Sequence, residues 1–268
     1  MKPLPGRLVL LGHPVQHSLS PAFQNAALRS ASLPLRYEAM DVHPDALDEA
    51  VRELVAANAA GNVTIPHKER VAALCGQLTP LAARVGAVNT FWVHDGTLVG
   101  DNTDVGGFRE ALAMVAPNVD TSAPVAVLGA GGAAAAVLAA LEQQGFPDVR
   151  LQCRTASRAT ALAERFTAVW PVDRVADAVR DAMLVVNATP VGLDGQSLPF
   201  DVMLLHKRAI VLDLVFGRDA TPLVRLARAH GHTADDGLEM LLAQGALAFK
   251  RWFGIEPDRA VMREAVAR

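Results

Sequence analysis

The chain has 268 residues, of which 51% are hydrophobic and 20% are charged, and its formal net charge at pH 7 is -3. At about 150 residues per domain, this length predicts two domains or one large one, and the composition excludes a disordered or collagen-like chain. A slightly acidic chain offers no basic face to a phosphate backbone, so we expect no nucleic-acid partner. Cys75 and Cys153 are too few for a disulfide framework, which favours a reducing, cytoplasmic location.

Strand-like and helix-like stretches alternate from end to end, which is typical of an α/β protein with parallel sheets. Ser20 followed by Pro21 indicates a capped helix start, because serine is a favoured cap and proline is favoured at the first helical position. Asp95 and Gly96 between two short apolar runs predict a hairpin over 90–99. The expected strands are 8–11, 36–40, 63–65, 125–128, 150–153, 184–187 and 210–214.

The hairpin breaks the alternation, and we place the change of domain directly after it. A helix over 104–114 leads into a connection that contains Pro117 and Pro124. The expected domains are 1–103, 104–236 and a final helical segment, 237–268. We expect no signal peptide, because Gly12 interrupts the first apolar run. The uncharged stretch 121–141 is long enough to span a membrane, but proline and glycines divide it into strand, turn and helix, so we expect no span.

A glycine-rich loop follows the strand expected over 125–128. Its residues 129, 131 and 134 have the G-x-G-x-x-A spacing of a dinucleotide loop, in which glycines allow a tight turn and close approach of a pyrophosphate to a helix N-terminus. We therefore expect a Rossmann-type domain, in which Gly129, Ala130, Gly131, Gly132 and Ala133 would contact the dinucleotide. The alternative is a flexible turn before an alanine-rich buried helix.

The residues after the next strand indicate which dinucleotide binds. An NAD enzyme would have an acidic residue there for the ribose 2′-hydroxyl, whereas this chain has Arg154, Thr155 and Arg158 after Cys153. Two guanidiniums and a hydroxyl suit a 2′-phosphate, because arginine gives paired, charge-assisted hydrogen bonds. The predicted cofactor is NADP. The alternative is that both arginines are solvated residues at a helix start.

An enzyme that interconverts an alcohol and a ketone with a nicotinamide needs a side chain that moves a proton. Tyr37 is the single tyrosine, and it cannot form a Tyr-x-x-x-Lys pair because Asp41 occupies the lysine position. Lys68, at a strand-to-helix junction, is the best remaining candidate, although a lysine at a helix start is more often simply solvated. Small polar residues that could hold a polyhydroxylated substrate are Ser18, Ser20, Thr64, Asn89, Thr103 and Asp104.

Metal and hydrolytic chemistry have little support. His13 and His17 are four apart, but Pro14 between them argues against the helix that would align them, so we expect no metal site. The chain has no G-x-x-x-x-G-K-[ST] loop and no G-x-S-x-G elbow, which argues against phosphoryl transfer and serine hydrolysis.

Taken in order, the motifs resemble those of the shikimate dehydrogenase family over nearly the whole chain. The segments that carry the resemblance are 12–21, 62–68, 86–90, 100–104, 125–134, 154–158, 187–189, 213–216 and 237–244. The resemblance implies an N-terminal substrate domain and a Rossmann-type NADP-binding domain, with the C-terminal helices packing back on the first domain. It also implies NADPH-dependent, reversible reduction of 3-dehydroshikimate to shikimate, a step toward the aromatic amino acids.

The resemblance assigns roles to single residues. Lys68 and Asp104 would form the catalytic pair, and Ser18 and Ser20 would hold the substrate carboxylate. The ring hydroxyls would be held by Thr64, Asn89, Asp104 and Gln244, and the cofactor site would be completed by Thr189, Leu214 and Gly237.

The chain also departs from the family. Phe216 stands where the family usually has a tyrosine that hydrogen-bonds the substrate, Cys153 replaces a usual asparagine, and Gln24 replaces a common histidine. Phe216 keeps open a quinate/shikimate or aminoshikimate dehydrogenase. A second alternative, a non-catalytic NADP-binding regulator, would be expected to lack the Lys68 and Asp104 that are present. The sequence does not give the oligomeric state, and a homodimer is left open.

Overall fold

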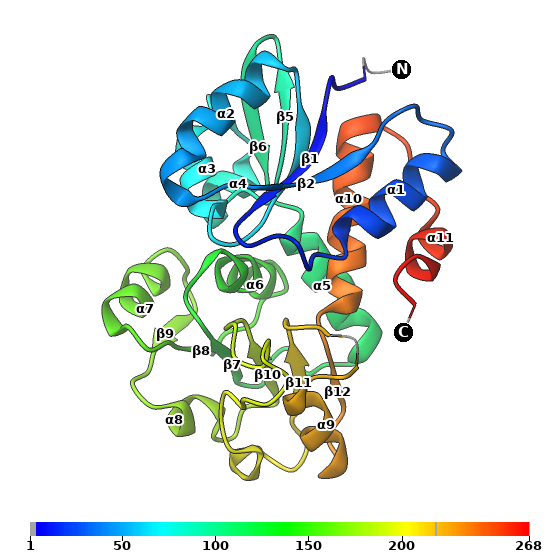
Figure 1. Cartoon of the computed structure of the whole chain (residues 1–268). Coiled ribbons are helices and arrows are strands. Elements are labelled where there is room, and N and C mark those ends of the chain that lie inside the picture. The colour runs from blue at the N-terminus through cyan, green and yellow to red at the C-terminus, as the bar shows by residue number, and fades with distance from the viewer. Residues whose placement is uncertain (1–3, 218, 268) are drawn as a thin grey trace. The chain divides into compact units, whose positions relative to one another are not determined.

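The computed structural model describes residues 4–217 and 219–267, which form two compact units (Figure 1). Within the described residues, unit 1 comprises 4–107 and 241–267, and unit 2 comprises 108–217 and 219–240. The chain passes between the units inside two helices, α5 (Asp104–Val115) and α10 (Leu238–Phe253). The expected domain limits lie at the start of α5 and one residue before α10, in each case four residues ahead of the division between the units.

Unit 1 has a mixed sheet, six-stranded within the described residues, in the order β2-β1-β3-β5-β6-β4. β1 is parallel to both of its neighbours, whereas β5 is antiparallel to β3 and to β6. The predicted hairpin is confirmed as β5 and β6, with Asp95 and Gly96 both at positive φ in the turn. The strands are β1 (Leu8–Gly12), β2 (Tyr37–Asp41), β3 (Ala60–Val63), β4 (Gln77–Leu78), β5 (Thr90–His94) and β6 (Thr97–Asp101).

Helices cover both faces of this sheet (Figure 1). On one face Leu54 of α2 and Val71 of α3 pack with Leu11 and Phe91 of the sheet. On the other lies α1, together with the unit 1 part of α10, in which Trp252 Nε1 donates to Thr90 of β5, and α11 packs against α1 (Figure 1). The expected return of the C-terminal helices to the first unit is therefore confirmed. The remaining elements are α1 (Ser20–Ser30), α2 (Leu47–Ala56), α3 (Lys68–Leu74), α4 (Pro80–Val85), α11 (Arg259–Glu264) and a 3₁₀ turn, η1 (Pro44–Ala46).

Two local predictions in unit 1 were wrong. The third strand was expected over 63–65 but is Ala60–Val63. A side chain on Gly61 would lie 2.0 Å from the Val9 carbonyl oxygen, so this strand depends on small residues that an apolar pattern does not reveal. Ser20 does not cap α1, because Leu19 is the cap residue and makes no side-chain cap bond.

Unit 2 has a parallel sheet, again six-stranded in the described residues, in the order β12-β11-β10-β7-β8-β9. This is the strand order of a dinucleotide-binding Rossmann domain, so that prediction is confirmed. The strands are β7 (Val125–Leu128), β8 (Val149–Gln152), β9 (Val169–Pro171), β10 (Leu184–Asn187), β11 (Ile210–Asp213) and β12 (Ala234–Asp235). The helices are α6 (Gly132–Gln143), α7 (Ala156–Ala163), α8 (Val175–Val179), α9 (Pro222–Ala229) and the 3₁₀ turn η2 (Val202–Leu204).

The order of the strands reverses between β7 and β10, which are neighbours in the sheet. In open α/β sheets, ligands bind beside the carboxyl ends of the strands at such a reversal, because the two connections leave in opposite directions. The glycine loop follows β7 and Thr189 follows β10, so both lie at that point. None of the helices in the described part of the chain is long and apolar enough to cross a membrane.

Candidate active site and cofactor loop

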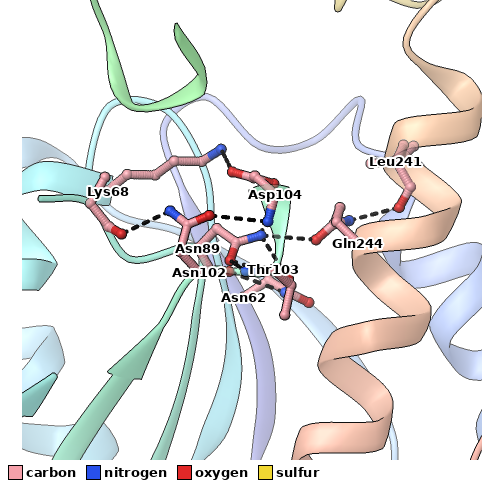
Figure 2. Close-up of polar contacts among 9 residues, drawn as sticks. Asn62, Lys68, Asn89, Asn102, Thr103, Asp104, Leu241 and Gln244 are labelled. Atoms are coloured by element: carbon pink, nitrogen blue, oxygen red, sulfur yellow. Dashed lines mark hydrogen bonds and ion pairs between the residues drawn. The ribbon is translucent and has the colours of Figure 1, made fainter. Parts of the chain in front are cut away.

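The lysine and the aspartate of the sequence motifs form an ion pair in unit 1. Lys68 begins α3 and Asp104 begins α5. Figure 2 shows the contact, in which Lys68 Nζ lies 2.7 Å from Asp104 Oδ2 and the side chains are 16% and 6% exposed. Because water solvates neither charge well, each depends on the other and on nearby hydrogen bonds. The pair is therefore held in place before any substrate binds.

His67 anchors the turn that precedes Lys68. Its ring is buried, and Nε2 lies 2.7 Å from the carbonyl oxygen of Val42. A carbonyl can only accept, so Nε2 carries the hydrogen. Burial lowers the pKa of His67 below its usual value, which keeps the ring neutral near pH 7. On the other side, Val88 N donates to Lys68 O at 2.9 Å, so the backbone of Lys68 is tied to a second segment.

Asn89 links Asp104 to α10. Its Nδ2 lies 2.8 Å from Asp104 Oδ1, 3.0 Å from Thr103 Oγ1 and 3.1 Å from Gln244 Oε1. These are more acceptors than two hydrogens can serve at once, so this amide can exchange partners. Thr103 N donates to Asn89 Oδ1 at 2.6 Å, which fixes the amide's orientation. The structure thus brings together five of the predicted residues: Lys68, Asn89, Thr103, Asp104 and Gln244 (Figure 2).

Ser18 and Thr64 lie on the loops after β1 and β3, and Ser20 is the first residue of α1. The two strands are parallel neighbours, so both loops leave the same edge of the sheet. His13 N donates to Ile65 O at 3.0 Å and joins the loops, while Ser18 Oγ accepts from Ser20 N at 3.2 Å. Among the described residues, the hydrogen-bonded group around the ion pair does not include these three hydroxyls.

Two asparagines of the site were not predicted from the sequence. Asn62 Nδ2 donates to Asn89 O at 3.1 Å, and Asn102 Oδ1 accepts from Asp104 N at 3.1 Å. The other end of Asn102 donates to Ala87 O at 2.8 Å. Both asparagines are buried. An amide within or beside an apolar strand was the available signal, because a buried polar group needs a partner.

The glycine loop of unit 2 has the geometry expected of a dinucleotide site. Gly129 has a φ of +110°, and a side chain there would lie 2.7 Å from the Ala188 carbonyl oxygen. Gly131 caps α6, and no side chain bonds to this helix start. A Cβ added at Gly131 would meet no atom within 4 Å, which means that the space beside the first turn of α6 is open at this residue. An anionic group fits there, because the first backbone N–H groups of a helix point outward.

Arg154, Thr155 and Arg158 follow β8, the strand beside β7, and all three are exposed. Arg158 Nη2 donates to Ala130 O at 3.3 Å, so this guanidinium lies against the glycine loop. Cys153 Sγ donates to Thr155 O at 3.0 Å. The charge and position of the two arginines fit the 2′-phosphate of NADP beside the predicted pyrophosphate position.

Asp213 joins the loops after β10 and β11. It is buried, and it accepts from Asn187 Nδ2 at 2.8 Å and from Thr221 Oγ1 at 2.6 Å. Burial raises the pKa of Asp213 above its usual value. Asn187 Oδ1 in turn accepts from Thr189 N at 3.1 Å and from Thr189 Oγ1 at 2.6 Å. Thr189 is thus oriented by a buried group that the sequence motifs did not single out as functional.

Leu214 and Gly237 lie side by side. A side chain on Gly237 would be 2.3 Å from Leu214 O, so only glycine permits this approach, and Gly237 N donates to Val215 O at 3.0 Å. Phe216 follows in the same loop after β11 and is half-buried. All eleven predicted cofactor residues and Phe216 belong to unit 2, whereas the other substrate residues belong to unit 1.

A Rossmann-type unit with a dinucleotide loop, together with a unit that carries a largely buried lysine–aspartate ion pair, defines a nicotinamide-dependent oxidoreductase. Three family models match the chain. They describe the shikimate dehydrogenase substrate-binding domain over residues 10–91, shikimate/quinate 5-dehydrogenase over residues 112–234, and the shikimate 5′-dehydrogenase C-terminal domain over residues 237–267. The chain belongs to the shikimate dehydrogenase family.

Individual relatives agree over almost the full length. The shikimate dehydrogenase (NADP(+)) of Rubrobacter xylanophilus is 44% identical over 96% of this chain and 94% of its own. The structure of shikimate 5-dehydrogenase from Thermus thermophilus in complex with NADP(H) and shikimate has a TM-score of 0.88, with 43% identity over 97% of this chain and 98% of that one. Quinate dehydrogenase from Corynebacterium glutamicum in complex with NAD has a TM-score of 0.85, with 33% identity over 96% of this chain and 97% of that one.

Proposed function

We propose that this protein catalyses the reversible, NADPH-dependent reduction of 3-dehydroshikimate to shikimate, with Lys68 and Asp104 as its catalytic pair. The observation that carries the proposal is the 2.7 Å contact between Lys68 Nζ and Asp104 Oδ2, bonded onward to Asn89 and Gln244. Family membership supplies the substrate class, and relatives of this chain are named for both shikimate and NADP.

Different groups supply the hydride, transfer the proton and bind the substrate. NADPH, when bound, supplies the hydride that reduces the ketone carbon. Lys68 Nζ donates a proton to the ketone oxygen as it becomes a hydroxyl, and it takes that proton back in the oxidative direction. Asp104 Oδ2 keeps Nζ in position. The amides of Asn89 and Gln244 can each donate and accept, so they suit neighbouring ring hydroxyls of either orientation.

The remaining assignments follow the same reasoning. Ser18 and Ser20 hold the substrate carboxylate with neutral donors, and Thr64 binds a ring hydroxyl. In unit 2 the α6 N-terminus holds the pyrophosphate and the exposed arginines hold the 2′-phosphate. The cofactor set comprises Gly129, Ala130, Gly131, Gly132, Ala133, Arg154, Thr155, Arg158, Thr189, Leu214 and Gly237.

A quinate or aminoshikimate dehydrogenase is the second candidate, and Phe216 is the observation that favours it. A benzene ring cannot make the hydrogen bond that a phenol makes to a shikimate-type acid. This departure leaves the preference among related ring acids open to measurement.

A panel of shikimate, quinate and aminoshikimate, each with NADP⁺ and with NAD⁺, tests the proposal. We expect the highest kcat/KM for shikimate with NADP⁺. A higher kcat/KM for quinate would move the assignment to the second candidate. If NADP⁺ binds but no ring acid is turned over, the chain is an NADP-binding regulator and the catalytic proposal is wrong.

We also propose a cytoplasmic location. Both cysteines are free thiols. Burial raises the pKa of the Cys75 thiol to about 11, so this partly buried side chain keeps its proton near neutral pH. Such thiols persist in a reducing compartment.

A further inference from the structure

The chain's single tyrosine is buried under the active site of unit 1. Tyr37 begins β2 and is 1% exposed. Burial raises the pKa of its phenol well above the usual value, so the hydroxyl keeps its proton. The phenol therefore exchanges no proton with substrate in the physiological range. What it can do is donate one hydrogen bond inside the protein.

That hydrogen bond is the first of a continuous series that ends at the ion pair. Tyr37 Oη donates to Asn62 Oδ1 at 2.8 Å, and Asn62 Nδ2 donates to Asn89 O at 3.1 Å. Asn89 Nδ2 then lies 2.8 Å from Asp104 Oδ1, and Asp104 Oδ2 lies 2.7 Å from Lys68 Nζ. Figure 2 shows the part of this series from Asn62 onward. Every member except the terminal lysine is nine-tenths or more buried.

The sheet explains why the phenol reaches Asn62. Tyr37 is on β2 and Asn62 is on β3, and β1 runs between these strands. The ring must therefore cross β1 to make the bond. Asn25 of α1 holds the backbone of the tyrosine at both ends, because Tyr37 N donates to Asn25 Oδ1 and Asn25 Nδ2 donates to Tyr37 O, each at 2.9 Å. Helix, edge strand and ring are thus fixed together.

We propose that Tyr37 is a positioning residue that acts through Asn62 on Asn89. Asn62 has one amide oxygen and one amide nitrogen, and the phenol determines which of them faces Asn89, because a donor requires the oxygen. The nitrogen is then committed to the Asn89 carbonyl. The same carbonyl also accepts from Val63 N at 2.8 Å, so Asn62 is its second donor, and the two bonds together set the angle at which the Asn89 side chain meets Asp104. The proposal rests on the proposed function of the Lys68–Asp104 pair.

Tyr37→Phe is the direct test, because it removes one hydroxyl and keeps the ring. Asn62 Oδ1 would then be buried without a donor, and the amide would turn to find one. We expect kcat for shikimate oxidation to fall by about tenfold, in line with the sensitivity of catalysis to small displacements. The pH profile of kcat should shift as well.

Thr90→Val is the matched control. Thr90 is buried on β5, next to Asn89 in sequence, and its hydroxyl bonds to Gly61 O at 3.1 Å and to Trp252 Nε1 at 3.0 Å. The variant therefore also removes one buried hydroxyl, but none that bonds to Asn89. We expect a comparable loss in melting temperature, with kcat and its pH profile within about twofold of the parent.

The double variant Tyr37→Phe/Asn62→Leu separates positioning from folding. Removing both partners of a buried hydrogen bond leaves neither unsatisfied, so the melting temperature should recover toward that of the parent. The carbonyl of Asn89 still lacks the Asn62 donor, so kcat should stay low. Recovery of kcat together with the melting temperature would show that the tyrosine acts only on stability, and would overturn the proposal.

The side-chain amide of Asn89 gives a readout that needs no substrate. Its ¹H–¹⁵N signals can be assigned by their loss in Asn89→Ser. We expect them to move in Tyr37→Phe and in the double variant and to stay in place in Thr90→Val. Unchanged signals in Tyr37→Phe would overturn the positioning role even if the parent protein turns over no shikimate, whereas an inactive parent with moved signals would contradict only the proposed function.

Discussion

The ion pair of unit 1 and the glycine loop of unit 2 are built in different ways. The ion pair consists of side chains that are 16% and 6% exposed and that bond to each other and to Asn89. The glycine loop is defined by backbone conformation, with Gly129 at a φ of +110°, and the charges next to it, Arg154 and Arg158, are exposed. Side-chain contacts set the geometry of the first site, and backbone shape and space set that of the second.

This difference predicts different responses to substitution. A buried charge that loses its partner is left uncompensated, so a single change in the ion pair affects the chemistry strongly. An exposed charge is solvated and screened, so each arginine should contribute a moderate share that weakens as salt rises. The glycine loop depends on backbone conformation, so its stability and its affinity for the cofactor should depend on the size of a substituted side chain and not on its polarity.

Lys68→Ala should give the largest effect. Without the amine, no group at that position can move the proton, so we expect kcat to fall by about 10² or more. The affinity for NADP⁺, measured by calorimetry, should persist because the cofactor residues are in unit 2. Lys250→Ala is the control, since Lys250 pairs with Glu256 at an exposed position of unit 1. A near-normal kcat in Lys68→Ala would remove this lysine from the mechanism.

The two loop glycines should respond differently to alanine. Gly129→Ala forces a side chain into a positive φ and toward the Ala188 oxygen, so we expect a loss of about 3 kcal/mol in the free energy of unfolding. Gly131→Ala meets no atom within 4 Å, so unfolding should be nearly unchanged. Its methyl group would occupy the space beside α6 and weaken NADP⁺ binding. Equal NADP⁺ affinity in parent and Gly131→Ala would show that the pyrophosphate does not approach there.

Arg158→Ala tests whether the exposed charges choose the cofactor. Losing charge-assisted bonds to the 2′-phosphate should cost about 2 kcal/mol, or roughly 30-fold in affinity for NADPH, with NADH unaffected. The effect should shrink as ionic strength rises. Arg225→Ala is a matched control, because Arg225 is also exposed in unit 2 and donates to a backbone carbonyl, that of Ala220. If Arg158→Ala lowers the affinity for NADPH and for NADH equally, the arginine does not bind the 2′-phosphate.

The sequence indicated the glycine loop and the candidate lysine because each is visible within one short segment. Gly129 and Gly131 have fixed spacing after a strand, and a lysine at a strand-to-helix junction is visible in one segment. Pairing Lys68 with Asp104 came from the family resemblance, since the two residues are 36 positions apart. The Rossmann-type architecture of unit 2 was likewise expected from the glycine loop and the strand before it.

The sequence could not predict the hydrogen bonds beneath the ion pair. Tyr37 and Asn62 meet only because β1 separates their strands by one position in the sheet, and nothing in either segment indicates this. The third strand was misplaced because the close approach of the β1 backbone, and not an apolar pattern within the strand, requires glycine at position 61. In both cases the deciding neighbour is distant in sequence.

Phe216→Tyr should have the smallest effect, and it tests the limits of the comparison. Phe216 belongs to unit 2, yet the family resemblance assigns it to substrate binding. At this position the contribution of unit 2 would come from a side chain and not from the backbone. Restoring a phenol should add one hydrogen bond to a charged group, worth about 1.5 kcal/mol, so KM for shikimate should fall roughly tenfold. The KM for NADP⁺ is the internal control and should not change, while the preference for shikimate over quinate should rise. An unchanged KM for shikimate would mean that this loop does not reach the substrate, and that recognition of the ring acid is confined to the side chains of unit 1.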